Sequence, residues 1–513
     1  MRPNLHRAIL GLLGLCLILL FRGCYEEVPI TEDPTDDGSF RVLSFDQVDG
    51  MVDTVENIIF FTIPSHKLSA YTPKVEFYGY SSVRMDHSEL LNGELNELGM
   101  VEANHYYSIF AKNGTRTDTF SLLFTTLPVI HITAYQEIPD EPKVLSHMVM
   151  QYNDPESGTP TVQSAKSFAG IEIRGGSAMR YDKKSYGVEL WDKNSGKDLS
   201  ASLLGMNYQE DWILDAMYID NLRMRNKISF ELWKKMSHAP SEDQRDYLEP
   251  GIECRMVELI LNNRYQGIYN LNEKLDVGLL QYTSDQYEKG GVLYKGIEWA
   301  DGSTLFETYN SEPPQDYLWD GWEQIYPEDY YSWNALAELR KLIVNAEDDE
   351  FESKIVSMID MENAVDYYLF INLLRAFDNA GKNIFLARYS DQSRFFIIPW
   401  DMDGSWGIWW NGDKAGSEGM IENQLFLRLK ETDAGNFNDL LESRWDEYRS
   451  TIFSKESLLS PISKYYSAMT SSGAMDRENS RWEDISIDPQ MEYEYISQWI
   501  DARLLYLDEK LDD

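Results

Sequence analysis

The sequence predicts an α+β protein in which a small all-β domain precedes a larger, two-lobed domain. Short segments rich in β-branched and aromatic residues alternate with turn-rich pieces over residues 39–126, which is typical of a β-sandwich. Beyond residue 127, strands with a single helix come first and long helical patterns follow, which favours two lobes of different composition. The length of 513 residues also exceeds what one hydrophobic core usually serves.

The small domain is expected to be an Ig-like sandwich over residues 39–126. Its strand segments are FRVLSF, NIIFFTI, KVEFYGY, HYYSIFAK and DTFSLLFTT, separated by pieces such as NGTRTD that favour turns. The domain contains no grouping of catalytic residue types, so a spacer or packing module is the favoured interpretation.

The larger domain, residues 127–513, begins with strands at LPVIHITAY, AGIEIRGG and YGVELWD. MRNKISFELWKKMS is expected to be a helix, because Ile228, Leu232 and Met236 recur at spacings of four. A hairpin is expected to turn at Asn262-Asn263. The later elements are helices at WNALAELRKLIVNA and MENAVDYYLFINLLRAF, a strand pair at NIFLARYS and RFFIIPWD, and a final helix at SQWIDARLLYLDEKL.

The N-terminus has the pattern of an export signal. Arg2 and Arg7 precede an apolar stretch at residues 8–21, which is short for a membrane-spanning helix and has the length of a signal-peptide core. We expect residues 1–23 to be a lipoprotein signal peptide and Cys24 to be the lipidation site. Simple cleavage and a retained anchor are the alternatives, because an arginine stands two residues before the cysteine.

Residues 24–38 form an acidic, proline-containing stretch that suits a tether beyond the lipid. The protein is therefore expected to be exported and attached to a membrane through Cys24, in the periplasm or on the outer surface. Cys16 would leave with the signal peptide and Cys24 would carry lipid, so Cys254 alone would remain. That count excludes an intrachain disulfide and a cysteine-based zinc site.

Net charge and motif content exclude several functions. The formal net charge of −40 argues against a nucleic-acid partner, because phosphates require Lys and Arg to neutralise them. The chain has no G-x-x-x-x-G-K-[ST], G-x-G-x-x-G, H-E-x-x-H or G-x-S-x-G motif. All seven histidines lie at or before His238, so the C-terminal half has no histidine-based triad.

Two polar clusters stand out in that half. FDNAGKN places Asp378 and Asn383 between an apolar helix and a strand, and IPWDMDGSWG places Asp401 and Asp403 after another strand. The D-x-x-x-x-N spacing occurs in protein-kinase catalytic loops, where the Asp orients the acceptor hydroxyl and the Asn holds a metal. Oxygen ligands of this kind suit Mg²⁺, which phosphoryl transfer requires. An Asp after a strand can also cap a turn, and this alternative stays open for Asp403.

Earlier segments follow the order that a kinase requires. Arg174-Gly175-Gly176-Ser177 is a small-residue turn after a strand, and Lys183 and Lys184 begin the next strand. Glu231 lies on the following helix, where it is a candidate partner for one of these lysines. Asn270–Glu273 falls where a hinge is expected. A solvated strand end is the alternative for the two lysines.

Together these segments resemble the CotH family of atypical, kinase-like enzymes. The matching pieces are RGGS, KKSYGVEL, the Arg225-Asn226 pair, YQGIYNLNEKLD, GVLYKG at Lys295, the D-x-x-x-x-N segment, PWDMDGSWG and ARLLYLDEKL, over roughly residues 127–510. The resemblance implies a two-lobed atypical protein-kinase-like fold, ATP and Mg²⁺ as cofactors, and phosphoryl transfer to Ser or Thr of a protein. Ala178 departs from the usual turn, which has a second small polar residue.

The resemblance also implies a role for each matching residue. Asp378 would be the catalytic Asp, and Asn383, Asp401 and Asp403 would hold the metal. The nucleotide would be bound by a further set of residues: Arg174, Ser177, Lys183, Lys184 and Glu273. The protein that accepts the phosphate is not identified by the sequence.

Two other functions remain open. The chain is alternatively a catalytically silent surface lipoprotein that uses the fold to bind or adhere to protein or glycan, or an enzyme that uses the same carboxylates in other metal chemistry. Tryptophans 319, 322, 333, 406, 409 and 410 are candidates for a carbohydrate-stacking surface, although tryptophan is more often buried in a core or an interface.

Overall fold

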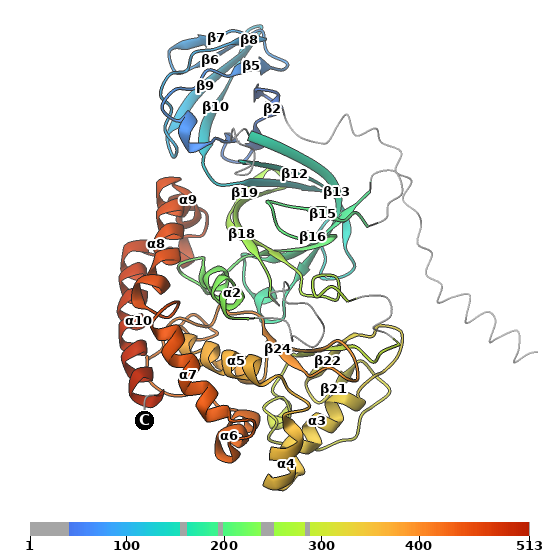
Figure 1. Cartoon of the computed structure of the whole chain (residues 1–513). Coiled ribbons are helices and arrows are strands. Elements are labelled where there is room, and N and C mark those ends of the chain that lie inside the picture. Colours follow the sequence, from blue (N-terminus) through green and yellow to red (C-terminus); the bar gives the residue numbers. More distant parts are fainter. Residues whose placement is uncertain (1–40, 154–161, 193–197, 238–250, 283–287, 512–513) are drawn as a thin grey trace, which may run out of the picture. The chain divides into compact units, whose positions relative to one another are not determined.

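The computed structural model describes residues 41–153, 162–192, 198–237, 251–282 and 288–511. The predicted signal peptide (1–23), the lipidation site Cys24 and the acidic tether (24–38) lie outside these residues. Helices and strands are both abundant, and the N-terminal part is rich in sheet, so the α+β class is confirmed (Figure 1).

Two sheets make up the region before residue 126. A four-stranded sheet has the order β2-β1-β5-β8, and a six-stranded sheet has the order β3-β4-β10-β9-β6-β7. Their strands are β1 (Leu43–Phe45), β2 (Val48–Asp49), β3 (Met51–Asp53), β4 (Ile58–Thr62), β5 (Lys74–Phe77), β6 (Ser82–Met85), β7 (Ser88–Leu90), β8 (Glu94–Leu95), β9 (Tyr106–Asn113) and β10 (Arg116–Thr125).

Alternating apolar residues of both sheets form one buried core. Phe45 of β1 stacks on Phe61, with ring centroids 4.5 Å apart, and the edge of Tyr71 meets the Phe45 ring at 5.9 Å. Each of the five predicted strand segments contains an observed strand. The assignment of residues 39–126 and 127–513 as separate domains stays a prediction.

A closed barrel follows, with the strand order β11-β12-β13-β14-β17-β19-β18. The strands are β11 (Val129–Ala134), β12 (Val144–Asn153), β13 (Val162–Arg174), β14 (Ser185–Trp191), β17 (Asp211–Asp215), β18 (Cys254–Leu261) and β19 (Arg264–Glu273). Parallel pairing of β11 with β18 closes it. The short strands β15 (Ala201–Ser202) and β16 (Tyr208–Gln209) pair beside it.

The β18–β19 hairpin turns at Asn262 and Asn263, as predicted. Both residues have positive φ, of 50° and 57°, and a two-residue hairpin turn requires this conformation. Helix α2 (Arg225–Met236) lies between β17 and β18 in the sequence, and its bounds agree with the predicted helical segment.

The C-terminal part combines a five-stranded sheet with helices (Figure 1). Its strand order is β21-β22-β20-β23-β24, formed by β20 (Val292–Gly296), β21 (Leu318–Trp319), β22 (Trp322–Tyr326), β23 (Ile384–Arg388) and β24 (Phe396–Pro399). The α-helices are α3 (Asn334–Asn345), α4 (Asp348–Ile355), α5 (Met361–Leu374), α6 (Gln424–Thr432), α7 (Phe437–Arg449), α8 (Lys455–Ser471), α9 (Ala474–Arg481) and α10 (Pro489–Leu511). Short 3-10 turns include η2 (Ser177–Arg180) and η5 (Phe377–Ala380).

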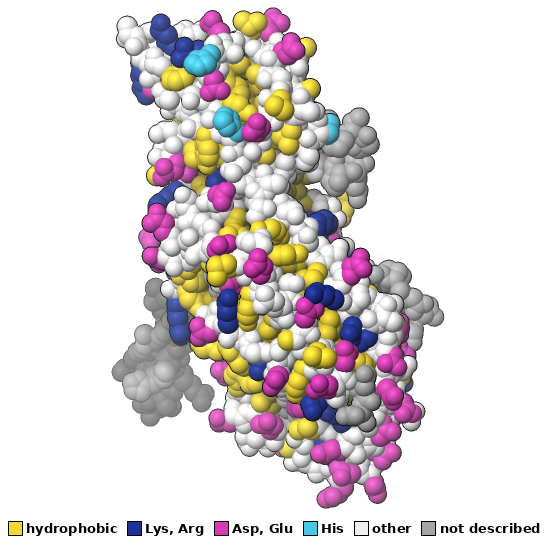
Figure 2. Space-filling model, turned by 90° about the vertical axis from the view of Figure 1, so that its left-hand side faces the viewer, with side chains coloured by type: hydrophobic (Ala, Val, Ile, Leu, Met, Phe, Trp, Pro, Cys, Tyr) yellow, Lys and Arg dark blue, Asp and Glu magenta, His cyan; other side chains and the backbone are white. Residues whose placement is uncertain are grey.

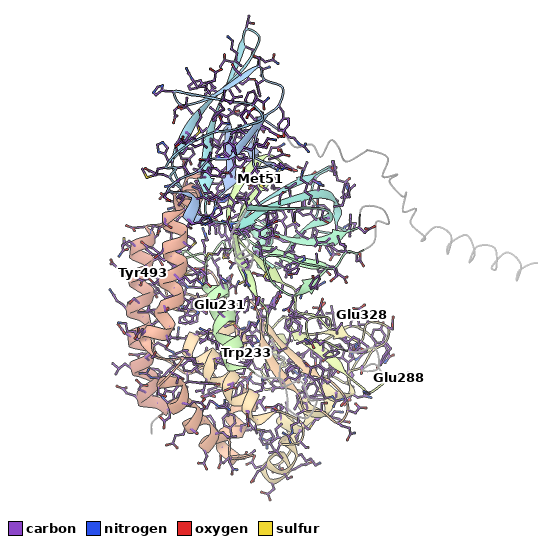
Figure 3. The ribbon with its side chains drawn as sticks, turned by 45° about the horizontal axis from the view of Figure 1, so that its top comes forward. Met51, Glu231, Trp233, Glu288, Glu328 and Tyr493 are labelled. Carbon is purple, nitrogen blue, oxygen red and sulfur yellow. The ribbon has the colours of Figure 1, made fainter. Side chains whose placement is uncertain are left out.

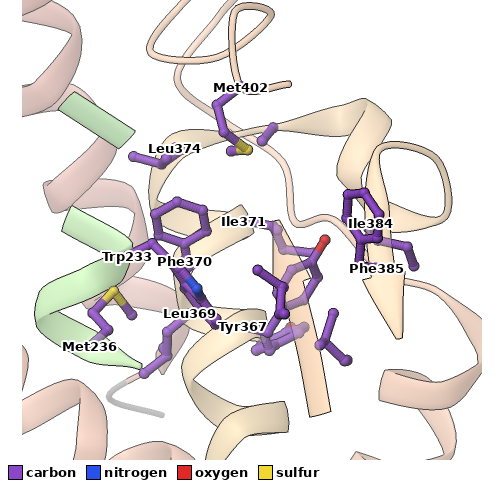
Figure 4. Close-up of a cluster of buried hydrophobic side chains, with 14 of the residues drawn as sticks. Trp233, Met236, Tyr367, Leu369, Phe370, Ile371, Leu374, Ile384, Phe385 and Met402 are labelled. Carbon is purple, nitrogen blue, oxygen red and sulfur yellow. The ribbon is translucent and has the colours of Figure 1, made fainter. Parts of the chain in front are cut away.

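Helix α5 is the centre of the largest core. Almost all of its side chains are buried, which explains its strongly apolar sequence. Trp233 of α2 packs against Tyr367 and Phe370 of α5, with ring centroids 5.8 and 5.2 Å apart (Figure 4). Helix α5 ends at Arg375, which has a left-handed backbone, and the chain turns there into the FDNAGKN segment.

A buried polar network joins α9 to the barrel and to the first two sheets. The Glu258 carboxylate on β18 accepts hydrogen bonds from the Thr125 hydroxyl at 2.6 Å, the Tyr265 hydroxyl at 2.7 Å and the Arg477 guanidinium at 2.8 Å. Arg477 also donates to the Asn104 side chain at 3.2 Å. The glutamate is fully buried, and the three donors compensate its charge.

The molecular surface is mixed in charge. Figure 2 shows Asp and Glu side chains spread over one face, with Lys and Arg among them. Among the residues that the structure describes, no helix has the length and apolar character needed to span a membrane.

Candidate active site

A cavity of about 570 Å³ lies between the barrel and the five-stranded sheet β21-β22-β20-β23-β24. It brings together six of the residues singled out from the sequence: Arg174, Lys183, Asp378, Asn383, Asp401 and Asp403. They come from the end of β13, the start of β14, the η5 turn and the two ends of the β23–β24 hairpin. Residues that are more than 200 positions apart in the chain therefore face one space.

The β23–β24 hairpin sets the spacing of two of these residues. Ile384 pairs with Pro399, so Asn383 and Asp401 flank the paired ends of adjacent strands. Both have left-handed backbone, with φ of 56° and 54°. Asn and Asp tolerate this conformation better than other side chains with a Cβ, and such strained positions are common at functional sites.

Two asparagines hold the hairpin ends in place. The Asn379 amide donates to the carbonyl oxygens of Asn383 at 2.9 Å and Trp400 at 2.8 Å. The side-chain oxygen of Asn226 on α2 accepts from the Met402 backbone at 2.5 Å, and its amide donates to the Asp215 carboxylate at 2.8 Å. Helix α2 thus fixes Asp215 and the segment between Asp401 and Asp403.

The carboxylates of the cavity destabilise one another's charge. Displacement of water by the surrounding protein raises the pKa of Asp401 to about 6, and the Asp215 carboxylate adds to this rise. The Asp401 side chain is nevertheless exposed, because it faces the water of the cavity. Burial and the neighbouring Asp401 charge raise the pKa of Asp403 well above its usual range. Among the described residues, neither carboxylate forms an ion pair.

Cations in the same cavity repel one another. Burial lowers the pKa of the Arg174 guanidinium. Burial and the nearby Arg174 charge lower the pKa of Lys295, which lies on β20 with its ammonium 5.6 Å from the Trp400 ring centre. Neither cation forms an ion pair with another described residue. The cavity therefore holds poorly compensated charges of both signs.

Lys183 is the exception, because its ammonium has an ion-pair partner inside the protein. Its ammonium donates to the Glu478 carboxylate at 2.7 Å and to the Ile268 carbonyl at 2.6 Å. The Arg223 guanidinium pairs with the same carboxylate at 2.9 Å. Burial lowers the pKa of Lys183 to about 8. The predicted partner on the helix, Glu231, is thus replaced by Glu478 from α9.

A glycine makes this approach of α9 to the barrel possible. Gly267 on β19 has φ of 98°, and a Cβ at this position would lie 1.9 Å from the Glu478 carboxylate oxygen. The same carboxylate accepts a hydrogen bond from the Ile268 backbone at 2.7 Å. The glycine in YQGIYN therefore provides both the backbone conformation and the space for Glu478.

Comparison with known proteins agrees with this arrangement. The family model described as CotH kinase protein matches residues 171–507, which include every residue that lines the cavity. The chain belongs to this family. Inner spore coat protein H from Bacillus subtilis (strain 168) is 21% identical over 363 residues, which cover 69% of this chain and 92% of that protein.

Two of the expected nucleotide-binding residues of the CotH family do not appear among the described lining residues. Lys184 instead donates to the carbonyl oxygens of Met179, at 2.7 Å, and Tyr181, so it fixes the turn after Arg174. Glu273 accepts from the backbone of Asn207 at 2.8 Å and of Glu253 at 2.7 Å. The side chain of Ser177 lies outside the described part of the structure.

Two further expectations need correction. Glu231 pairs with Lys227 at 2.9 Å and accepts a hydrogen bond from Tyr465, and Figure 3 shows it on the same helix as Trp233. The predicted hinge at Asn270–Glu273 is part of β19, paired with β17 and β18 inside the barrel.

Most of the tryptophans considered for carbohydrate stacking are buried. Trp319, Trp322, Trp333 and Trp406 are at most 3% exposed, so a stacking role is wrong for these four. Trp410 is 58% exposed and lines the cavity, and Phe377, directly before Asp378, is 52% exposed. Aromatic side chains therefore flank the cavity mouth.

The donor set fits Mg²⁺ bound together with phosphate. Among the described residues, no three His, Cys, Asp or Glu side chains are grouped as a ready-made metal site. Mg²⁺ commonly takes one or two carboxylates and completes its shell with water and substrate phosphate. Asp401, Asp403 and Asn383 offer hard oxygen atoms in one cavity, and a bound cation would offset the repulsion between the two carboxylates.

Several residues of the cavity were missed or given no role by sequence reasoning. Asp215 and Lys382 were not singled out. Asn226 and Lys295 were named only as parts of segments that match the CotH family, and no role was given to them. Glu478 lies outside every motif considered in the sequence, on the polar helix α9. The chain order gave no indication that α9 packs against β19, because that contact joins residues about 210 positions apart.

Proposed function

We propose that the chain is an exported CotH-type kinase that transfers phosphate from ATP, with Mg²⁺, to Ser or Thr of a protein. In this proposal the barrel is one lobe of an atypical kinase-like fold, and the five-stranded sheet with the C-terminal helices is the other. Membership of the CotH kinase protein family supports the class of activity.

The observation that carries the proposal is the presence of uncompensated charges of both signs in one cavity. A lone cation would satisfy Asp401 and Asp403 and would leave Arg174 and Lys295 without a counter-charge. A lone anion would do the reverse. A metal–nucleotide complex carries both signs next to one another, so it satisfies both sets of residues.

The residues divide into three roles. Arg174, Lys295 and the backbone of Gly175-Gly176 would hold the phosphates, and Asp401, Asp403 and Asn383 would hold Mg²⁺. The bound metal would supply charge neutralisation for the triphosphate. Lys183, held by Glu478, would position the β14 wall of the cavity.

Asp378 is suited to accept the proton of the acceptor hydroxyl. Burial raises the pKa of its carboxyl, while Lys382, whose ammonium is 3.9 Å away, opposes that rise. A raised pKa makes the carboxylate a better base. The hydroxyl oxygen would form a bond to the γ-phosphorus as the bond from that phosphorus to the β–γ bridging oxygen breaks. ADP would leave with that electron pair, and the hydroxyl proton would move to Asp378.

The acceptor would approach past the aromatic side chains at the mouth. Phe377 lies 5.8 Å from Trp299 and 6.0 Å from Trp409, measured between ring centres. Trp410 adds a further exposed ring beside Asp403 and Gly404. This surface suits an acceptor that presents a planar or apolar group next to its hydroxyl.

We further propose export and anchoring through a lipid on Cys24. The predicted signal peptide supports export, and the related Bacillus subtilis protein is named for the inner spore coat. The identity of the phosphoacceptor would follow from the compartment in which the protein is displayed.

The test is calorimetric titration of ATP with Mg²⁺ into the full-length chain and into Asp401→Asn. We expect saturable, magnesium-dependent binding that is lost in the variant. Asp46→Asn is the matched control, because Asp46 has the same left-handed backbone, with φ of 51°, but lies in the first sheets. Absence of binding by the intact, folded protein would overturn the proposal and favour a silent binding protein.

A further inference from the structure

A second cavity, distinct from the candidate active site, lies beside α2. Its volume is about 900 Å³, and its described walls come from α2, the start of β18, α8, the loop at 202–205 and the entry to the barrel at Leu127 and Pro128. Phe230 contributes to the lining of both cavities, so the two lie close to one another at α2.

The second cavity is positively charged in a strongly acidic protein. Among the described residues, its lining includes five cationic side chains and two anionic ones, a formal balance of +3, whereas the whole chain carries −40. The cations are Lys227, Lys234, Lys235, Arg255 and Lys464. They come from three elements, so the charge extends along the walls and is not confined to one point.

The two glutamates in this cavity are already compensated. Glu253 accepts from Lys234 at 2.7 Å and from Arg255 at 2.9 Å. Burial opposes the ionisation of Glu253 and Glu231, but their lysine, arginine and tyrosine partners outweigh it and lower both pKa values. These acids hold the inner cations in place, and the positive excess remains for a ligand.

Two of the three excess charges belong to exposed lysines. Lys235 near the end of α2 and Lys464 on α8 are both exposed, and neither forms an ion pair with a described residue. The Lys464 ammonium lies 5.2 Å from the Tyr465 ring centre, next to the Lys227–Glu231 pair. An anionic group that enters the cavity would meet these two ammonium groups first.

Apolar side chains also line the cavity. Leu127, Leu204, Phe230, Ile252 and Met256 line the cavity beside the cations. A small inorganic anion would leave these walls in contact with water. A nucleic acid would meet the repulsion of the acidic surface outside the cavity. A short acidic segment with apolar side chains satisfies both kinds of wall.

We propose that this basic cavity binds an acidic peptide segment of a partner protein, with apolar or aromatic side chains between its carboxylates. The ligand contacts Lys235 and Lys464 through its acidic groups and places an apolar side chain against Phe230 and Tyr465. This site does not depend on phosphoryl transfer, and it is separate from the nucleotide cavity.

The test measures binding of a fluorescent twelve-residue peptide of alternating Glu and Tyr or Leu to the full-length chain by anisotropy. We expect saturable binding that weakens with salt and falls about tenfold or more in the double variant Lys235→Glu with Lys464→Glu. The control is Lys354→Glu with Lys510→Glu. It makes the same charge change at exposed helical lysines outside the cavity, and it should leave affinity unchanged.

A peptide with Gln in place of every Glu should bind at least tenfold more weakly. Equal losses in the cavity variant and the control variant would overturn the proposal, as would equal binding of the Gln peptide. Displacement by millimolar inorganic phosphate, with no preference for the acidic peptide, would identify a small-anion site and overturn it also. Circular dichroism of each variant checks folding, and Lys464→Gln alone serves if the double variant is unfolded.

Discussion

The two cavities beside α2 differ in the state of their carboxylates. In the basic cavity, Glu231 and Glu253 have lysine and arginine partners and lowered pKa values. In the candidate active site, Asp401 and Asp403 have no ion-pair partner among the described residues and raised pKa values. Neighbouring cavities thus contain acids that the protein has paired with cations and acids that it has not.

The difference teaches how to distinguish structural from functional acids within one acidic chain. A lowered pKa shows that the fold already supplies the cation, so the acid contributes to stability. A raised pKa shows that the folded state disfavours the charge, and an acid that also faces a cavity without an ion-pair partner is a candidate to bind an external cation. Predictions about single substitutions therefore differ in sign between the two kinds of acid.

The largest effect is expected at Asp378. Asp378→Asn should lower phosphoryl transfer by about 100- to 10,000-fold, because the amide cannot accept the hydroxyl proton. Binding of ATP with Mg²⁺ should persist, because Asp378 is not expected to hold the metal. Turnover by phosphate release or substrate labelling, measured beside calorimetry, separates the two quantities. Loss of nucleotide binding in this variant would place Asp378 among the metal ligands.

Removal of a compensated acid should destabilise the fold. Glu478→Gln leaves the buried cations Lys183 and Arg223 without their counter-charge, which should lower the free energy of unfolding by about 3–5 kcal/mol. Urea denaturation followed by fluorescence measures this change. Glu350→Gln is the control, because its pair with Lys354 is exposed and should cost less than about 1 kcal/mol. Equal effects would show that the buried triad carries no special stability.

Gly267 provides a second way to disturb the same triad. Gly267→Ala places a Cβ 1.9 Å from the Glu478 carboxylate, whereas Gly93, with φ of 79°, has no atom within 4 Å of such a Cβ. Both substitutions strain a left-handed backbone by about 1–2 kcal/mol. Gly267→Ala should cost about 2 kcal/mol more, because α9 must move away from β19. Similar unfolding midpoints for the two variants would contradict the close packing of Glu478.

The sequence was sufficient for the parts of the fold that depend on local patterns. The five strand segments of the first sheets, helix α2 and the Asn262-Asn263 turn follow from apolar periodicity and turn chemistry. The closed barrel could not be predicted from these local patterns. Its closure depends on pairing of β11 with β18 across about 130 residues, and local periodicity carries no information on such a pairing.

The candidate site shows the same division. Asp378, Asn383 and Asp401 were found because motif spacing and chain order point to them, and all three line one cavity. Glu478 was not found, and Glu231 was chosen in its place, because a buried ion pair depends on which elements pack together. Lys183 and Lys184 directly precede β14, and the first bonds to Glu478 while the second bonds to the carbonyl of Met179. The sequence alone did not show which of them faces the cavity.

The smallest expected effect is a gain in stability, whereas Glu478→Gln and Gly267→Ala should cause losses. Asp401→Asn should stabilise the metal-free protein above pH 6, because the folded state disfavours the carboxylate charge and its pKa lies near 6. Below about pH 4 the carboxyl is protonated in both the folded and the unfolded states, so the gain should disappear as the pH falls from 6 to 4. Solvent in the cavity screens the repulsion, so we expect no more than about 1 kcal/mol.

Thermal unfolding in EDTA at pH 4, 6 and 8 measures the gain, and Asp46→Asn corrects for the preference of asparagine for left-handed backbone. Addition of Mg²⁺ with ATP should stabilise the unsubstituted protein and not Asp401→Asn, because an amide at position 401 offers the bound cation no negative charge. A loss of stability in the metal-free Asp401→Asn protein at pH 8 would mean that Asp401 is compensated like Glu231 and Glu253. The contrast between the acids of the two cavities would then not hold for Asp401.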